Sequence, residues 1–213
     1  MILRRADMST YKVTYFNGRG RGELIRLLLV AGGQEFEDER LTRDEWAKIK
    51  SNMPQGQIPV LTVDGKVLPQ SGAIHRYLAR RLGLYGKTNE DMTTNDIIME
   101  TVNDTRNALI KAHFEQDEAK KAELYKIVKE QTIPNFLKVM ETLLCENNGG
   151  NGFFVGSELT IGDLAVVDLL DVLIQRISPN VLDNNDKLKA HRERVCSSPR
   201  IKKWLETRPQ TEM

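Results

Sequence analysis

The residue best placed for chemistry in this sequence is Tyr15, at the end of an alternating stretch over residues 11–16. Every second side chain of that stretch, Tyr15 included, would point to one face of a β-strand. Residues 17–22 follow as a turn with three glycines and two arginines, and helical spacing of apolar residues begins at once, over residues 24–31. Open α/β sheets bind ligands where strands end in such units, so Tyr15 is the leading functional candidate.

Other kinds of reactive site find little support in the residue spacing. The glycines at 18, 20 and 22 have neither the GxGxxG spacing of a dinucleotide site nor the lysine of a phosphate-binding loop. None of the three histidines, His75, His113 and His191, has a serine or cysteine nearby in a triad-like arrangement, and no His/Cys cluster has metal-ligand spacing. We therefore expect no metal site.

Composition narrows the class of protein. The 213 residues suffice for one large or two small domains, and a net charge of +1 argues against nucleic acid as a partner. Residues 1–83 hold 14 basic against 9 acidic side chains. This excess suits a small anionic ligand, although uneven surface charge without a role explains it equally well.

The sequence also favours a cytoplasmic location. No apolar run approaches the ~18 residues of a membrane span, so we expect no membrane association. Residues 1–7 are too short and too charged for a signal peptide. Cys145 and Cys196 are far apart and form no Cys-x-x-Cys motif, which is typical of a reduced intracellular protein.

The elements that must position Tyr15 are predicted over residues 8–84. A short edge strand is expected over 36–41 and a helix over 44–50. Asp64-Gly65 between apolar runs predicts a hairpin with a type I′ turn. Ser71 is a natural N-cap for the helix that follows. The predicted order is β-α-β-α-β-β-α.

The remainder of the chain is predicted to be helical. We expect residues 1–7 to be an extension, residues 85–91 a linker, and residues 92–213 an all-α domain. The expected helices cover about 98–112, 119–146, 186–196 and 199–206, besides one that begins after Thr160. Pro134 should kink or divide the second of these.

The helix after Thr160 has the clearest start in the chain. Thr160 and Asp163 form a capping box, with aspartate in place of the commoner glutamate. Its body is apolar except for a thin polar stripe of Asp168, Asp171 and Gln175, so we expect it to be buried on most sides.

These motifs, in this order, resemble the cytosolic glutathione S-transferases. The resemblance rests on the opening strand and Gly-Arg-Gly-Arg-Gly loop, Ile58-Pro59 before the hairpin, Gln70-Ser71, and Thr160-Ile161-Gly162-Asp163. Trp46, Lys50 and the closing Arg-Pro-Gln-Thr resemble the sigma class, which includes haematopoietic prostaglandin D synthase. The resemblance implies a thioredoxin-like domain followed by an all-α domain, a homodimer, and glutathione as co-substrate.

The resemblance also implies how Tyr15 would work. The thiol of glutathione should titrate near 8.5, so little reactive thiolate exists at pH 7. A neutral tyrosine hydroxyl can donate a hydrogen bond to sulfur and favour the thiolate. Tyr15 resembles the catalytic tyrosine of the family, and Arg21 resembles an arginine whose positive field adds to this effect. We expect the charge of Arg19 to have a structural role in the loop.

Further residues resemble the glutathione contacts of the family. Ser71, at a helix N-terminus, and Gln70 would hold the γ-glutamyl carboxylate. The backbone of Ile58, before an expected cis-proline, would pair with the cysteinyl main chain. The remaining contacts would come from Trp46 and Lys50 to the glycine carboxylate, from Gln57, and from Asp104 across the dimer.

Some positions depart from the prostaglandin synthase pattern. Its cation-binding carboxylates fall on Glu100, Asn103 and Asp104, and one amide among them weakens a site for a hard cation. Lys111 stands where that enzyme has a tryptophan. We therefore expect metal-independent conjugation of small hydrophobic electrophiles, bound partly by the helix at 103–112. Two alternatives remain open: a glutathione-dependent prostaglandin D synthase, and a non-catalytic crystallin-like or ligand-binding relative.

Overall fold

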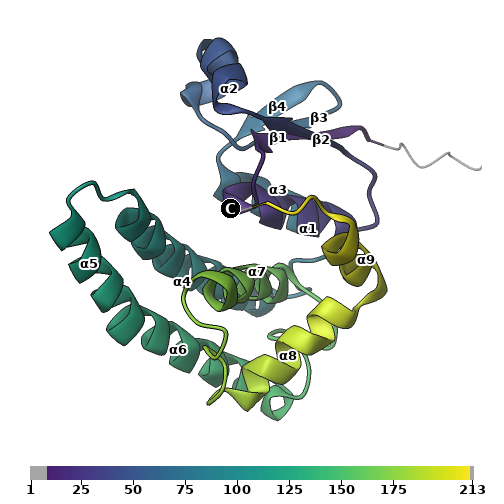
Figure 1. Ribbon diagram of the computed structural model, residues 1–213. Helices are drawn as coiled ribbons and strands as arrows, with labels where there is room; N and C mark the ends of the chain where they lie inside the picture. Colours follow the sequence, from purple (N-terminus) through teal and green to yellow (C-terminus); the bar gives the residue numbers. More distant parts are fainter. Residues whose placement is uncertain (1–8, 212–213) are drawn as a thin grey trace, which may run out of the picture. The chain divides into compact units, whose positions relative to one another are not determined.

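The computed structural model describes residues 9–211, and the extension expected at residues 1–7 lies outside them (Figure 1). The chain forms two compact units. The first unit comprises the chain up to Leu84 together with residues from Pro199 onward, and the second runs from Tyr85 to Ser198. Residues 199–211 were expected in the all-α domain, but their helix packs along the first helix of the first unit.

The first unit is built on a four-stranded sheet in the order β2-β1-β3-β4. Its strands are β1 (Tyr11–Phe16), β2 (Glu37–Leu41), β3 (Val60–Val63) and β4 (Lys66–Pro69). β1 pairs parallel with β2 and antiparallel with β3, which leaves β2 at one edge, as predicted. The predicted thioredoxin-like β-α-β-α-β-β-α order is confirmed.

Helices α1 (Glu23–Ala31) and α3 (Ser71–Arg81) pack against each other beside the sheet, and α9 (Pro199–Thr207) packs on α1 (Figure 1). Helix α2 (Arg43–Ile49) begins at a capping box of Thr42 and Glu45. Short 3-10 turns cover Gly20–Gly22, Lys50–Asn52 and Pro54–Gly56. Asp64 and Gly65 both have positive φ, the signature of the predicted type I′ turn.

The second unit is helical. Its helices are α4 (Asn89–Phe114), α5 (Glu118–Ile127), α6 (Ile133–Glu146), α7 (Ile161–Arg176) and α8 (Asp186–Ser197), with a 3-10 turn at Asn148–Gly150. A π-helical segment, Val128–Thr132, separates α5 from α6. The long helix expected over 119–146 is thus divided just before Pro134, which falls in the first turn of α6, where a missing N–H is tolerated.

Helix α7 is the core of the second unit, and it is buried from Ile161 to Asp171. Of the expected polar stripe, Gln175 is exposed, whereas Asp168 and Asp171 are buried. Asp168 lies 2.7 Å from the Arg106 guanidinium of α4, and Asp171 lies 2.6 Å from that of Arg192 on α8. Because a buried charge is costly unless it is paired, these aspartates connect α7 to its neighbours.

The predicted capping box of α7 is present and buried. Asp163 Oδ2 accepts hydrogen bonds from the Thr160 backbone N–H (2.7 Å) and hydroxyl (2.8 Å). Its Oδ1 accepts from the Phe154 N–H at 2.9 Å and lies 2.7 Å from His191 Nε2. On the same turn, Asn95 Oδ1 accepts from the Gly162 N–H. The box therefore joins α7 to α4, to α8 and to the preceding loop.

Three carboxylates at turns and helix starts should make the stability of the fold depend on pH. Backbone hydrogen bonds, from Thr42, from Thr10 and from Lys87 with Thr88, lower the pKa of Glu45, Asp64 and Asp91 respectively. A lowered folded-state pKa adds stability above the unfolded pKa, which is lost as pH falls through the folded value.

We therefore expect the urea concentration at the unfolding midpoint to stay constant between pH 7 and about pH 4.5. Below about pH 4.5 it should decrease, because unperturbed carboxyl groups begin to take up protons at that pH. In an Asp91→Asn variant the loss between pH 7 and pH 3.5 should be smaller, because one contributing group is gone. Urea unfolding at both pH values measures this difference. Equal losses in both proteins would contradict it.

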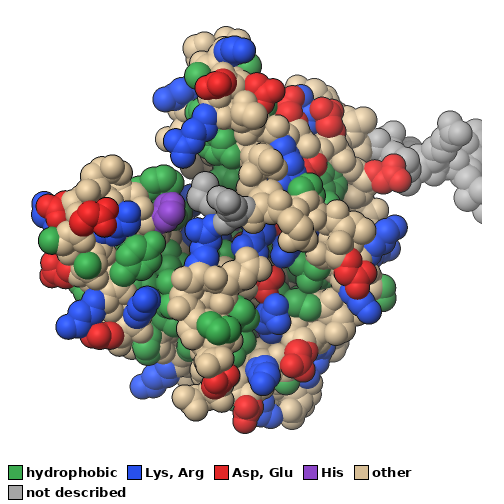
Figure 2. Space-filling view, viewed as in Figure 1, with side chains coloured by type: hydrophobic (Ala, Val, Ile, Leu, Met, Phe, Trp, Pro, Cys, Tyr) green, Lys and Arg blue, Asp and Glu red, His purple; other side chains and the backbone are tan. Residues whose placement is uncertain are grey.

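The described surface carries charges of both signs, scattered over both units in the face shown in Figure 2. Within residues 9–211, no helix combines the length and apolar character needed to cross a bilayer. Cys145 and Cys196 are both free thiols.

Candidate functional site

Tyr15 is the last but one residue of β1, and its ring packs under the loop of residues 17–22, here called the tyrosine loop. Its hydroxyl oxygen accepts a 3.3 Å hydrogen bond from the backbone N–H of Arg21. A Cβ atom on Gly20 would lie 2.7 Å from that oxygen, and one on Gly22 would lie 2.7 Å from Tyr15 Cδ1. Only glycine allows so close an approach, and Gly20 also has a φ of +41°. The side chains of Tyr15 and Arg21 are partly exposed.

Aromatic contacts connect Tyr15 to Trp46. The rings of Tyr15 and Phe16 lie 5.7 Å apart, and those of Phe16 and Trp46 lie 6.1 Å apart in an edge-to-face arrangement. Trp46 is on α2 and is partly exposed. The structure thus brings Trp46, which the sequence placed only on a helix, close to the end of β1.

Lys50, Gln57 and Ile58 belong to the segment between α2 and β3. The pairing of β1 with β3 ends at Thr14 and Val60, so Ile58 lies beyond the ladder, toward the end of β1 where Tyr15 is located. The Ile58–Pro59 peptide is cis, as expected. Lys50 and Gln57 are exposed, and the Lys50 side chain passes next to Gly56.

The start of α3 differs from the prediction. Ser71 is the first residue of the helix, and Gln70, not Ser71, is the N-cap. Gln70 has a φ of +72°, and no side chain caps the helix, so its first backbone N–H groups point outward without a side-chain acceptor. Such a helix start attracts carboxylates.

Gln55 is a neighbour of this site that sequence reasoning missed. Gln70 donates a hydrogen bond from Nε2 to Gln55 Oε1, and Gln55 also has a positive φ, +58°. Strained backbone in non-glycine residues concentrates at ligand-binding positions. No sequence signal marks Gln55, because neither its type nor its spacing predicts this conformation.

Asp104 lies in the second unit, on α4, and its side chain is exposed. It is therefore not among the residues that the first unit brings together. Among the described residues, no three His, Cys, Asp or Glu side chains are grouped so that they could hold a metal ion.

Two charged residues behind the tyrosine loop were also missed. Glu23 and Arg26 look like an ordinary i, i+3 pair on a helix surface, yet both side chains are fully buried. Arg26 donates a 2.8 Å hydrogen bond from a terminal nitrogen to the carbonyl oxygen of Gly18. Buried charge next to a loop of this kind is visible only once the packing is known.

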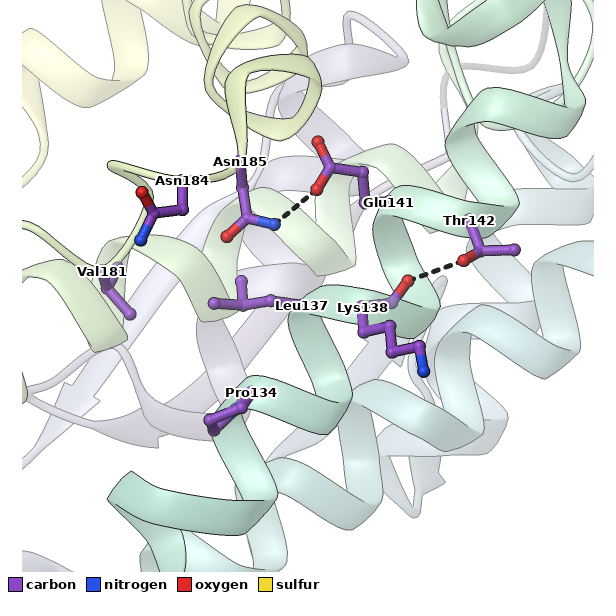
Figure 3. A pocket seen from close by; sticks show the side chains of 8 residues that line it. All are labelled: Pro134, Leu137, Lys138, Glu141, Thr142, Val181, Asn184 and Asn185. Atoms are coloured by element: carbon purple, nitrogen blue, oxygen red, sulfur yellow. Dashed lines mark hydrogen bonds between the residues drawn. The ribbon is translucent and has the colours of Figure 1, made fainter.

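The second unit has an open pocket of about 470 Å³ between α6 and the segment before α8 (Figure 3). It is lined by Pro134, Leu137, Lys138, Glu141, Thr142, Val181, Asn184 and Asn185, and Asn185 donates a hydrogen bond to Glu141 across it. None of the predicted site residues lies there. The candidate site is thus the surface of the first unit around Tyr15.

Comparison with known proteins gives the same family for both parts of the chain. The N-terminal domain family of the glutathione S-transferases matches residues 11–80, and their C-terminal domain family matches residues 103–208. Probable glutathione S-transferase 8 of Caenorhabditis elegans is 39% identical over 212 residues, 96% of this chain and 100% of that protein.

Two further relatives indicate the class. Hematopoietic prostaglandin D synthase of Gallus gallus is 37% identical over 96% of this chain and 99% of its own. The structure of a Nu-class transferase from Haemonchus contortus matches with a TM-score of 0.87 at 42% identity, over 97% of this chain and 100% of that one. This chain belongs to the cytosolic glutathione S-transferases, in a sigma- and nu-like class related to hematopoietic prostaglandin D synthase.

Proposed function

We propose that this protein conjugates glutathione to small hydrophobic electrophiles in the cytoplasm, with Tyr15 stabilising the thiolate. The observation that carries the proposal is the position of the Tyr15 hydroxyl, at a strand end and next to the Arg21 N–H. The oxygen accepts from this N–H, so its own hydrogen is available to donate to sulfur. The positive charge of Arg21 would favour the charged form further.

The other residues would orient glutathione around this hydroxyl. The uncapped start of α3, with Ser71 and Gln70, suits the γ-glutamyl carboxylate. Lys50 and Trp46 would hold the glycine carboxylate, while Gln57 and the Ile58 backbone would contact the rest of the tripeptide. We further propose a homodimer in which Asp104 reaches the glutathione bound by the partner subunit. The proposed conjugation calls for no metal.

An ultraviolet difference titration of enzyme-bound glutathione from pH 5 to pH 9 tests the proposal. Thiolate absorbance should appear well below the ~8.5 of a free thiol. If glutathione binds and no thiolate forms near neutral pH, the protein is a binder without the proposed chemistry.

Binding of glutathione should weaken by about tenfold in a Ser71→Ala variant. Loss of a hydrogen bond to a charged group costs about 1.5 kcal/mol, which corresponds to that factor. Isothermal titration of glutathione measures the change. Ser51→Ala, an exposed serine of the 3-10 turn after α2, serves as the control. An unchanged dissociation constant for Ser71→Ala would remove Ser71 from the site.

Isomerisation of a prostaglandin endoperoxide is a second candidate, favoured by the 37% identity to the Gallus gallus synthase. It would use the same thiolate. Asn103 and Lys111, which depart from the pattern of that enzyme, weigh against it. A glutathione-dependent assay with the endoperoxide, run beside a conjugation assay, compares the two activities directly.

A further inference from the structure

Behind the tyrosine loop, Arg26 occupies the centre of a buried hydrogen-bond network. Its side chain is fully buried and donates to three oxygens: Gly18 O at 2.8 Å, Asp38 Oδ1 at 2.8 Å and Glu23 Oε2 at 3.2 Å. The bond to Gly18 holds the first turn of the loop that packs on Tyr15. Arg40 is bound to the other oxygen of Asp38 at 2.7 Å, which fixes that carboxylate in turn.

The same network reaches the C-terminal part of the chain. Glu23 Oε1 accepts from Trp204 Nε1 at 2.8 Å and from Arg208, just after α9, at 2.9 Å. Glu23 is fully buried, and 11% of the Arg208 side chain is exposed. Residues more than 180 positions away along the chain thus hold the carboxylate that faces Arg26.

We propose that Trp204 and Arg208 are positioning residues of the thiolate site. They hold Glu23, Glu23 orients Arg26, and Arg26 holds the Gly18 carbonyl and with it the tyrosine loop on the Tyr15 ring. This inference rests on the proposed function of Tyr15. It adds that the C-terminal residues Trp204 and Arg208 keep the loop around Tyr15 in position.

Small displacements of the tyrosine loop should affect Tyr15, because the two are tightly packed. The loop glycines pack so closely on Tyr15 that the loop and the ring must move together. Without Arg208, buried Glu23 keeps two donors, Arg26 and Trp204, and draws the Arg26 guanidinium toward itself and away from Gly18. A shift of a fraction of an ångström at a reacting group is enough to weaken catalysis.

An Arg208→Met variant, with Arg200→Met as the matched control, tests the inference. Arg200 also joins α9 to α1, by donating to Ala31 O at the opposite end of α1, far from the tyrosine loop. Two quantities are measured in each protein: amide hydrogen exchange of residues 17–22, and the pKa of the bound glutathione thiol.

Arg208→Met should speed exchange in residues 17–22 and raise the thiol pKa by about half a unit, a threefold loss of thiolate near neutral pH. Arg200→Met should change neither quantity, and Arg208→Lys should restore part of both. Trp204→Phe provides a second test: it removes the indole N–H that donates to Glu23 and keeps an aromatic ring facing Phe36, whose centroid lies 5.8 Å from that of Trp204.

The inference is overturned if Arg208→Met and Trp204→Phe lower the melting temperature while exchange in the loop and the thiol pKa match the wild type. Equal effects from Arg200→Met would also overturn it. Absence of thiolate in the wild type would instead refute the proposed function, and loop exchange would still decide whether α9 positions the loop.

Discussion

A Tyr15→Phe variant is expected to lose about 10²-fold in kcat for conjugation at neutral pH, as when one preorganised donor to a developing anion is removed. The phenylalanine ring fills the same space under the tyrosine loop, so the fold should persist. The missing hydroxyl leaves the thiol to titrate closer to 8.5, and each unit of pKa costs about 1.4 kcal/mol. Steady-state kinetics from pH 6 to pH 9 should therefore show the deficit shrinking as pH rises.

Tyr11→Phe is the matched control for this experiment. Tyr11 lies on the same strand, and its hydroxyl also accepts one hydrogen bond, from Arg81 Nε at 2.8 Å, but at the far end of β1. We expect its kinetics to equal those of the wild type. If both variants lose activity equally, the effect is on the strand as a whole and not on the thiolate.

An Asp163→Ala variant should lose several kcal/mol of unfolding free energy, because each buried donor left without an acceptor costs about 1–3 kcal/mol. The substitution leaves the Thr160 and Phe154 N–H groups and the His191 ring without their acceptor, in a part of the second unit from which water is excluded. Equilibrium denaturation in urea, followed by circular dichroism, measures the loss.

Asp91→Ala is the control, because Thr88 and Asp91 form the same capping box at the start of α4 with its hydrogen bonds exposed to solvent. Water replaces the lost acceptor there, so we expect a much smaller loss than in Asp163→Ala. If the two variants lost similar amounts of unfolding free energy, burial of the Asp163 box would add nothing to its contribution to stability.

Features determined by neighbouring residues were predictable from the sequence. The Asp64-Gly65 turn, the Thr160–Asp163 box and the division before Pro134 each depend on side chains a few positions apart, and all three are present. The boxes at Thr42 and Thr88 have the same spacing and were within reach of the same reasoning.

Features determined by distant partners were not predictable. Asp168 and Asp171 have helical spacing that suits a solvent-facing stripe, and only their arginine partners on other helices explain their burial. The N-cap of α3 is one residue before its predicted place, at Gln70, which has a positive φ and donates a hydrogen bond to Gln55 in the segment before β3. No local pattern assigns α9 to the first unit.

The assignment of α9 also has a consequence for synthesis on the ribosome. Residues 9–84 leave the ribosome well before Trp204 and Arg208, so nascent Glu23 has Arg26 as a partner but lacks its two donors from the C-terminal part. The buried hydrogen-bond network around Glu23 therefore cannot be completed until the whole second unit has been translated. A ribosome that stops before residue 199 leaves the thioredoxin-like unit incomplete, although every strand of its sheet has already been made.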